Sequence, residues 1–164
     1  MKRFLAVAGV FAFFSLQLVF SDTVVVYMEN ENTDNLWDNE KITLVRALEN
    51  GITDSFFEAG HILINTNIDG RGSPFPGIER AFLLAKANGA SYLLKVGLFF
   101  GSTNGDISAE VLYAEYELFE VVTEKMVGKG EIYAESLEGV KKSDSEEVSF
   151  SLGKALGRNA MKQW

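Results

Sequence analysis

Three stretches of the chain repeat their apolar residues at helical spacing, and they predict three helices. In the first, apolar side chains recur every four residues, which indicates an amphipathic helix from about Glu40 to a stop at Gly60. The second covers residues 78–87 and ends at Asn88-Gly89, and the third covers residues 145–162. The apolar positions that define these stripes are Leu44, Leu48, Ile52, Phe56, Ile78, Phe82, Ala85, Val148, Leu152, Ala155 and Leu156.

Five other stretches have the pattern of β-strands. Residues 23–28 read TVVVYM, a continuous apolar run of the kind expected for a strand buried on both faces. Residues 61–67, 90–100, 109–122 and 129–136 predict the remaining strands, and residues 124–128 the turn before the last one. In the fourth strand the alternation allows one bulge before Leu118, and four acids, Glu110, Glu115, Glu117 and Glu120, indicate a face toward water.

The order of these elements is β-α-β-α-β-β-β-α, which begins as crossovers and ends as a meander. It predicts an α+β fold in which a single layer of mixed sheet, with about five strands, packs with three helices. A doubly wound parallel sheet is the less economical interpretation. Ser143 and Glu146 have the spacing of a capping box at the start of the last helix.

The first residues of the chain have the pattern of an export signal. Lys2 and Arg3 precede an apolar run, and Val19 and Ser21 place small side chains before a cut. We therefore expect residues 1–21 to be a signal peptide and residues 22–164 to be a single domain that is exported to the periplasm. The alternative is a retained anchor, because the 17 residues from Phe4 to Phe20 approach the length that spans a bilayer.

The amino-acid composition excludes several classes of ligand and of binding site. The chain has 15 basic and 23 acidic residues, and its net charge of −8 repels phosphate backbones and anionic head groups, so neither nucleic-acid binding nor membrane insertion of the mature chain is expected. It has no cysteine and one histidine, His61, which excludes disulfides, thiolate metal sites, a lipid-bearing cysteine and a site with two histidines. We expect no catalytic residue, no metal and no cofactor, and we interpret His61 as a structural or surface residue.

One segment carries a family resemblance. Gly89-Ala90-Ser91-Tyr92 opens a strand that contains Val96-Gly97 and leads to a long strand and a hairpin. This arrangement resembles the small envelope domain shared by the activator lipoproteins of penicillin-binding proteins and the periplasmic part of the curli-secretion channel protein. The match in element order covers about residues 23–163. The resemblance implies a non-enzymatic accessory or adaptor domain that docks on a larger envelope assembly.

Three residues are candidates for binding a partner. Arg71 and Phe75 belong to a segment rich in glycine and proline, and arginine and aromatic side chains are enriched at interface hot spots. The alternative for this segment is a loop without a binding role, because it lacks the glycine order of a phosphate-binding motif. Trp37, in a polar loop, is either a plug over the first helix or an exposed anchor.

Two further functions stay open at this point. The 13 phenylalanines, among them Phe99 and Phe100 in a predicted strand, motivate a periplasmic carrier of a small apolar ligand. A hydrolase that uses Glu115 and Glu117 is the third hypothesis, although two acids on one strand face are also what a solvated sheet shows. The partner's identity, the oligomeric state and any ligand are not determined by the sequence.

Overall fold

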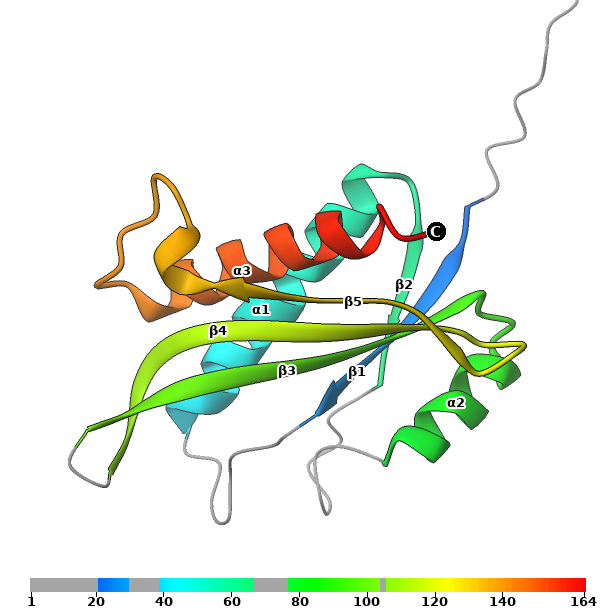
Figure 1. Ribbon diagram of the computed structural model, residues 1–164, viewed down its shortest axis with the longest axis horizontal. Coiled ribbons are helices and arrows are strands. Elements are labelled where there is room, and N and C mark those ends of the chain that lie inside the picture. Colours follow the sequence, from blue (N-terminus) through cyan, green and yellow to red (C-terminus); the bar gives the residue numbers. More distant parts are fainter. Residues whose placement is uncertain (1–20, 30–38, 67–76, 104–105) are drawn as a thin grey trace, which may run out of the picture.

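The computed structural model describes residues 21–29, 39–66, 77–103 and 106–164, and within them it leaves out the side chains of residues 39–40 and 102–110. The described residues form one five-stranded sheet, three α-helices and one 3₁₀ turn (Figure 1). In chain order these are β1 (Thr23–Glu29), α1 (Asn39–Glu58), β2 (Ile62–Asn65), α2 (Ile78–Ala87), β3 (Tyr92–Thr103), β4 (Asp106–Glu120), β5 (Lys125–Tyr133), the 3₁₀ turn (Ala134–Ser136) and α3 (Ser145–Ala160).

The sheet is mixed, and its strand order is β2-β1-β3-β4-β5. β1 pairs in parallel with both β2 and β3, whereas β3, β4 and β5 follow one another antiparallel. The predicted fold class and the predicted order of elements are therefore confirmed.

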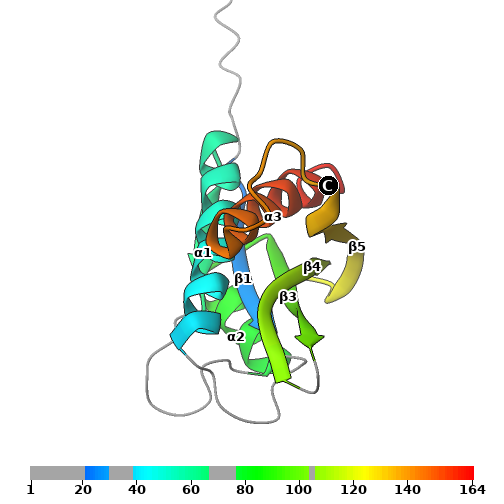
Figure 2. The same ribbon diagram turned by 90° about the vertical axis from the view of Figure 1, so that its left-hand side faces the viewer.

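The helices form layers on the two faces of the sheet. The crossover from β1 to β2 moves one way along the sheet and the crossover from β2 to β3 moves back past β1, so right-handed connections place α1 and α2 on opposite faces. α1 and α3 lie side by side on one face (Figure 2). No helix among the described residues has the length and apolar character needed to cross a membrane.

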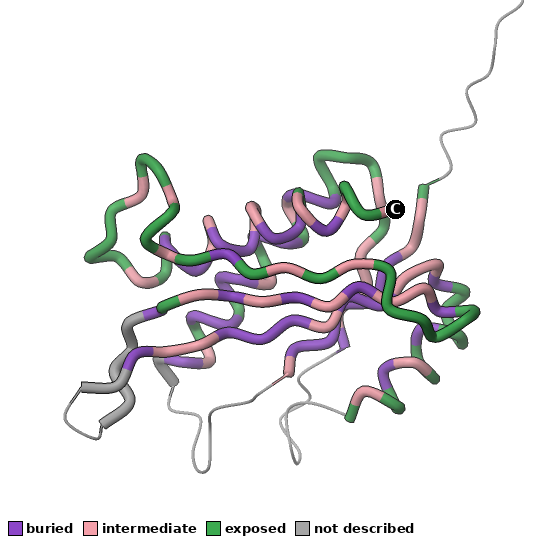
Figure 3. The backbone as a smooth tube through the Cα atoms, viewed as in Figure 1, coloured by how far each residue is buried: buried purple, intermediate pink, exposed green. Residues whose placement is uncertain are grey.

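Burial follows the hydrophobic pattern of the sequence. Val24 to Met28 of β1 are buried, as expected for a central strand covered on both faces, and Figure 3 shows this together with the buried inner sides of α1 and α3. Leu48, Ile52 and Phe56 of α1 have no exposed surface, so the predicted stripe of the first helix is confirmed. The outer strand β5 is mostly exposed.

The predicted capping box of the last helix is wrong. Asp144 is the N-cap of α3, and its carboxylate accepts a hydrogen bond from the main-chain N–H of Glu147 at 3.1 Å. An aspartate satisfies the open end of a helix as well as a serine does, so the cap shifts by one residue and Ser143 stays outside it.

The last turn and strand also differ from the prediction. β5 begins at Lys125, so the turn precedes it, and Gly128 and Gly130 lie inside the strand. These glycines meet bulky neighbours: a Cβ on Gly128 would stand 2.7 Å from the Gln163 side chain, and one on Gly130 would stand 2.8 Å from the Tyr116 ring. Glycine at these two positions lets neighbouring side chains approach the main chain of β5 closely. The local sequence does not distinguish a glycine with this role from a glycine in a turn.

One strand end and the bulge complete the comparison. β2 covers only Ile62–Asn65 of the predicted 61–67, and residue 67 lies outside the described residues. β4 has an extra residue at Leu112, because Phe99 pairs with Tyr113 and Phe100 with Val111, so a bulge lies before Leu118 as the alternation allowed. Residues 1–20 are outside the described part of the chain, so the signal peptide stays a prediction.

Candidate functional site

The residues that the sequence singled out for binding are not placed by the structure. Arg71, Phe75 and Trp37 all fall outside the described residues. They stay predictions, and the candidate site has to be built from the part of the chain that the structure describes.

His61 belongs to an aromatic cluster where α1 ends and the strands β2 and β3 begin. Its ring lies edge-on to Phe56, with centroids 6.2 Å apart, and to Trp164, with centroids 5.4 Å apart. Trp164 also stacks on Tyr92 at 4.7 Å. The Nδ1 atom of His61 is buried and has no hydrogen-bond partner. A ring packed in this way is part of the architecture, in line with the structural interpretation of His61.

Glu115 and Glu117 of β4 share the sheet face of Phe119, which contacts Phe82 of α2, and Lys95 balances part of their charge. Glu117 stands across from Lys95 of β3, and Lys95 forms ion pairs with Glu117 at 3.2 Å and with Glu29 of β1. Partial burial lowers the pKa of Lys95, but the hydrogen bonds to Glu29 and Glu117 outweigh it, and the pKa is raised. These ion pairs connect β1, β3 and β4, and the interpretation of Glu117 that they favour is a structural one.

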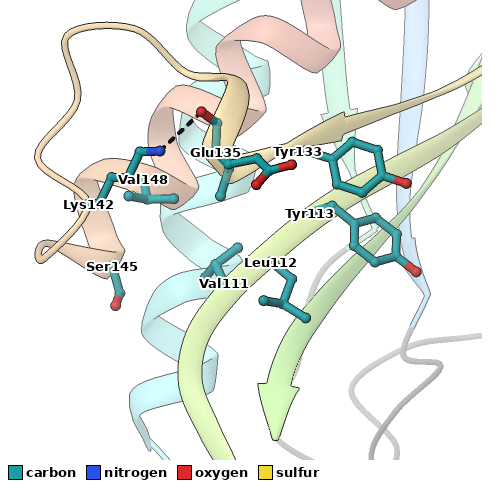
Figure 4. Close-up of a pocket in the computed structure, with 9 residues that line it drawn as sticks. Val111, Leu112, Tyr113, Tyr133, Glu135, Lys142, Ser145 and Val148 are labelled. Carbon is teal, nitrogen blue, oxygen red and sulfur yellow. Dashed lines mark hydrogen bonds between the residues drawn. The ribbon is translucent and has the colours of Figure 1, made fainter.

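A groove opens at the end of β5, between β4 and the beginning of α3 (Figure 4). We call it the β5-end groove, and its volume is about 490 Å³. Val111 from β4 and Val148 from α3 both line it, and Lys142 lies beside Val148 (Figure 4). The residues that line the groove are Val111, Leu112, Tyr113, Tyr133, Ala134, Glu135, Lys142, Ser145 and Val148.

The groove exists because β5 is shorter than β4. Tyr133 is the last residue of β5 and pairs with Tyr113, and the chain then turns into the 3₁₀ segment, where the Ser136 hydroxyl donates to the Tyr133 carbonyl at 2.6 Å. β4 continues over residues 106–112 and there pairs with β3 only, within the described part of the chain. An edge with open main-chain donors and acceptors therefore borders the groove.

An aromatic ladder runs across three strands beside this edge. Phe99 of β3 stacks on Tyr113 of β4 with centroids 4.3 Å apart and planes 7° apart, and Tyr113 contacts Tyr133 of β5 at 5.3 Å. Tyr133 is 46% exposed and Leu112 is 43% exposed. The hydroxyls of Tyr113 and Tyr133 point in the same direction (Figure 4). A flat apolar surface with polar tips is therefore available at the groove.

The surroundings of the ladder are acidic. The register places Glu115 of β4 directly opposite Glu131 of β5, a like-charge pair of the kind that destabilises a sheet. Tyr133 donates a hydrogen bond to Glu131 at 2.8 Å, and this bond raises the pKa of the Tyr133 hydroxyl. Glu135 lies at the groove, while the Lys142 amine donates to the main-chain oxygen of Glu135 at 3.1 Å.

Few of the side chains that line the groove are ionisable or nucleophilic. Its lining holds one carboxylate, one amine and one alcohol, and the amine is bound to a main-chain oxygen rather than poised beside the Ser145 hydroxyl. Among the described residues no group of three or more His, Asp or Glu side chains is arranged to hold a metal ion. The arrangement is suited to holding a ligand by shape, main-chain hydrogen bonds and charge.

One feature of the sequence could have indicated this groove: Tyr113 and Tyr133 lie in two consecutive strands joined by a short turn. The position of that turn sets the register between the strands and therefore decides whether the two tyrosines pair. With the turn expected at 124–128 instead of before Lys125, the register that brings the two tyrosines together could not be read.

No protein-family model matches the sequence, and no curated protein matches it. Three solved structures share part of its backbone arrangement. The PelC dodecamer from Paraburkholderia phytofirmans is 14% identical, with 87% of each chain covered and a TM-score of 0.47. Lipoprotein GNA1162 from Neisseria meningitidis is 14% identical, with 68% of this chain and 80% of that chain covered and a TM-score of 0.46. The LpoB C-terminal domain from Salmonella enterica is 19% identical, with 69% and 83% covered and a TM-score of 0.41.

One of these structures is a lipoprotein and another is the C-terminal domain of LpoB. At these identities and scores the likeness concerns the arrangement of helices and strands, and no functional conclusion rests on it.

Proposed function

We propose that the chain is an exported, non-enzymatic accessory or adaptor protein that binds a larger protein assembly of the bacterial envelope through the β5-end groove. The observation that carries the proposal is the edge of β4 at residues 106–112, which among the described residues pairs with β3 alone and at Val111 and Leu112 reaches a groove of about 490 Å³ next to an exposed aromatic ladder. Export rests on the predicted signal peptide, residues 1–21.

The partner we propose is an extended segment of an envelope protein. An extended segment placed beyond Tyr133 would continue the line of β5 and bond to the main chain of β4, which is the mode of recognition known as β-strand addition. Main-chain bonds of this kind supply affinity, and the neighbouring side chains select the sequence. Tyr133, which is partly exposed, is a residue type enriched at interface hot spots, and the partly exposed Leu112 adds apolar surface beside it.

Charge gives the chemistry of that segment. Glu135 lines the groove, Glu131 accepts the hydrogen bond of the lining residue Tyr133, and the chain as a whole has a net charge of −8. A lysine or arginine of the partner would relieve the repulsion between Glu115 and Glu131 and could lie over the ring of Tyr133. The segment is therefore basic, with apolar residues at alternate positions.

Two phenylalanines that suggested a ligand carrier have packing roles. Phe99 is stacked on Tyr113, and Phe100 packs against the core with the Lys41 amine 5.9 Å from its ring centre. They are used within the sheet and its surroundings, which favours the accessory function over the carrier.

The test is site-specific photocrosslinking in the cells that make the protein. A photoreactive phenylalanine analogue replaces Leu112 in the groove or, as the matched control, Leu83, which is 68% exposed on α2. We expect one dominant envelope protein to be captured from position 112 and not from position 83. Mass spectrometry of the adduct identifies the partner peptide and the first residue of the mature chain, which we expect to be Asp22.

Two outcomes would count against the proposal. Equal capture from both positions, or none from position 112 while the protein is folded and exported, would remove the groove as the docking site. A mature chain that retains Met1 would replace the exported form with an anchored one.

A further inference from the structure

The other end of the sheet also presents an open edge. β2 pairs with β1 on one side, and no described element pairs with its other side. The N–H of Ile62 donates to Asp22 O at 3.0 Å and the N–H of Thr66 donates to Val26 O at 3.1 Å, so alternate residues of β2 face β1. Because neighbours in a strand point their main-chain groups in opposite directions, Leu63 and Asn65 direct theirs outward.

β2 lacks two of the features that commonly protect edge strands. Its four residues, Ile62 to Asn65, carry no charge and no proline, and shortness is the protection that this described strand does have. Ile62 is 54% exposed, and Phe57 of α1 beside it is 79% exposed. Both line a hollow of about 400 Å³ that reaches Leu63. A hydrogen-bonding edge and an apolar surface therefore lie together.

We propose that this edge is a self-association surface, at which two copies of the chain pair their β2 strands antiparallel around a two-fold axis at Ile64. In this arrangement the outward main-chain groups of Leu63 bond to those of Asn65 in the second copy, and the reverse pair forms by symmetry. The strand is complementary to itself, because Leu63 and Asn65 stand one position to either side of Ile64.

Charge favours a second copy over another occupant. The chain has a net charge of −8, so two copies repel each other wherever acids meet, and a contact between copies is least opposed at an uncharged surface. β2 offers no carboxylate to a basic partner, in contrast with the groove at the end of β5. The two surfaces lie on opposite edges of the sheet, at β2 and at β4–β5, so self-association leaves the groove open to its partner.

Single cysteines test the axis directly, because the natural chain contains none. In the proposed pair the two Ile64 positions are a non-hydrogen-bonded pair with Cα atoms about 4.5 Å apart, within disulfide reach. The two Ile62 positions are about 14 Å apart, beyond that reach. Protein purified from the cells that make it, with I64C or I62C, is oxidised gently and separated without reductant. We expect a disulfide dimer from I64C and none from I62C.

A second measurement does not depend on cysteine. Light scattering after size-exclusion chromatography should show that the mass of the natural protein rises from that of a monomer to that of a dimer as its concentration increases. The variant Leu63→Pro, which removes an outward N–H, should keep the mass of a monomer. Proline is tolerated at an edge strand whose N–H faces solvent. Ile62→Lys places a charge on the edge and should also give a monomer, whereas Leu83→Lys on α2 should leave the dimer intact.

The proposal is overturned if the natural protein stays monomeric up to about 1 mM, the range of the weakest specific contacts. It is equally overturned if I62C crosslinks as readily as I64C, or if folded Leu63→Pro and Ile62→Lys dimerise like the natural chain. Circular dichroism of each variant shows whether it is folded. Crosslinking from Leu112 to an envelope protein is a separate readout, so the failure of this inference and that of the proposed function are distinguishable.

Discussion

Gly153 of α3 lies directly against the main-chain oxygen of Leu48 in α1: a Cβ placed on Gly153 would stand 2.1 Å from that oxygen. Gly51 in α1 is placed in the same way against the main-chain oxygen of Phe150, at 2.0 Å. The two helices therefore approach each other through glycines contributed by both. The cost of glycine within a helix is offset here by contacts that no larger residue permits.

The first prediction concerns this contact. Gly153→Ala should lower the free energy of unfolding by about 3 kcal/mol, because the methyl group can be accommodated only if two packed helices separate. Urea denaturation followed by circular dichroism measures the change. Gly77→Ala is the control, since no atom lies within 4 Å of a Cβ there; alanine is a poorer N-cap of α2 than glycine, so we expect a loss of no more than about 1 kcal/mol. Equal effects at the two positions would contradict the close approach of α1 and α3.

The second prediction concerns the charge cluster on the open sheet face. Lys95→Met should destabilise the protein by about 2 kcal/mol, because it leaves Glu29 and Glu117 facing each other with only about a quarter to a third of each side chain exposed. Lys86→Met breaks an ion pair with Glu124 in which both side chains are about half exposed, and it should cost less than about 0.5 kcal/mol. Thermal unfolding of the two variants in parallel gives the comparison. A ranking in the opposite order would sink the idea.

The third prediction is a pH dependence. Burial raises the pKa of Glu49 from 4.5 to about 7, although Arg46 partly opposes the shift. Between pH 4.5 and 7 the folded chain therefore holds a proton that the unfolded chain has released. Stability from this group is complete below pH 4.5 and is lost as pH rises through 7. The loss is on the order of 3 kcal/mol at most.

The variant for that test is Glu49→Gln, which keeps the shape of the side chain and removes the titration. The difference in unfolding free energy between the variant and the natural protein should grow from pH 4.5 to pH 7 in favour of the variant. Urea titrations across this range measure it. A difference that stays constant with pH would show that burial does not shift the pKa of Glu49.

The fourth prediction concerns the aromatic cluster around His61. Trp164 stacks on Tyr92 with planes 17° apart and also contacts Phe56 at 5.7 Å. Trp164→Ala should destabilise the fold by about 3 kcal/mol, and Trp164→Phe by less than half of that, because a smaller ring still fills part of the space. Urea denaturation followed by circular dichroism compares the two variants with the natural chain, because the substitutions themselves remove the Trp164 fluorophore. Unchanged stability in Trp164→Ala would exclude a packing role.

Much of the fold follows from residues that act through local periodicity. Val24 to Val26 are β-branched and consecutive, and they form the central strand of the sheet as their run predicts. Leu48, Ile52 and Phe56 repeat at helical spacing and face the core, with no exposed surface. Such patterns are set by the geometry of a single element and do not depend on what that element packs against.

The candidate site could not be predicted in this way. Gly128 was expected in the turn, but it lies inside β5, where the Gln163 side chain occupies the space that its missing side chain leaves. The bend that the sequence placed at residues 124–128 therefore lies earlier. The register that joins Tyr113 to Tyr133, and the place where β5 ends beside the longer β4, both depend on that turn.

The sequence by itself determined the order of strands and helices, the apolar faces that they bury and the acidic, cysteine-free character of the chain. The tertiary structure decided which glycines are points of close contact, which aspartate caps α3 and where, among the described residues, β2 and the first part of β4 have a neighbouring strand on one side only. The physical reason is range: periodicity and composition act along the chain, whereas contacts and open edges are created when segments distant in sequence meet.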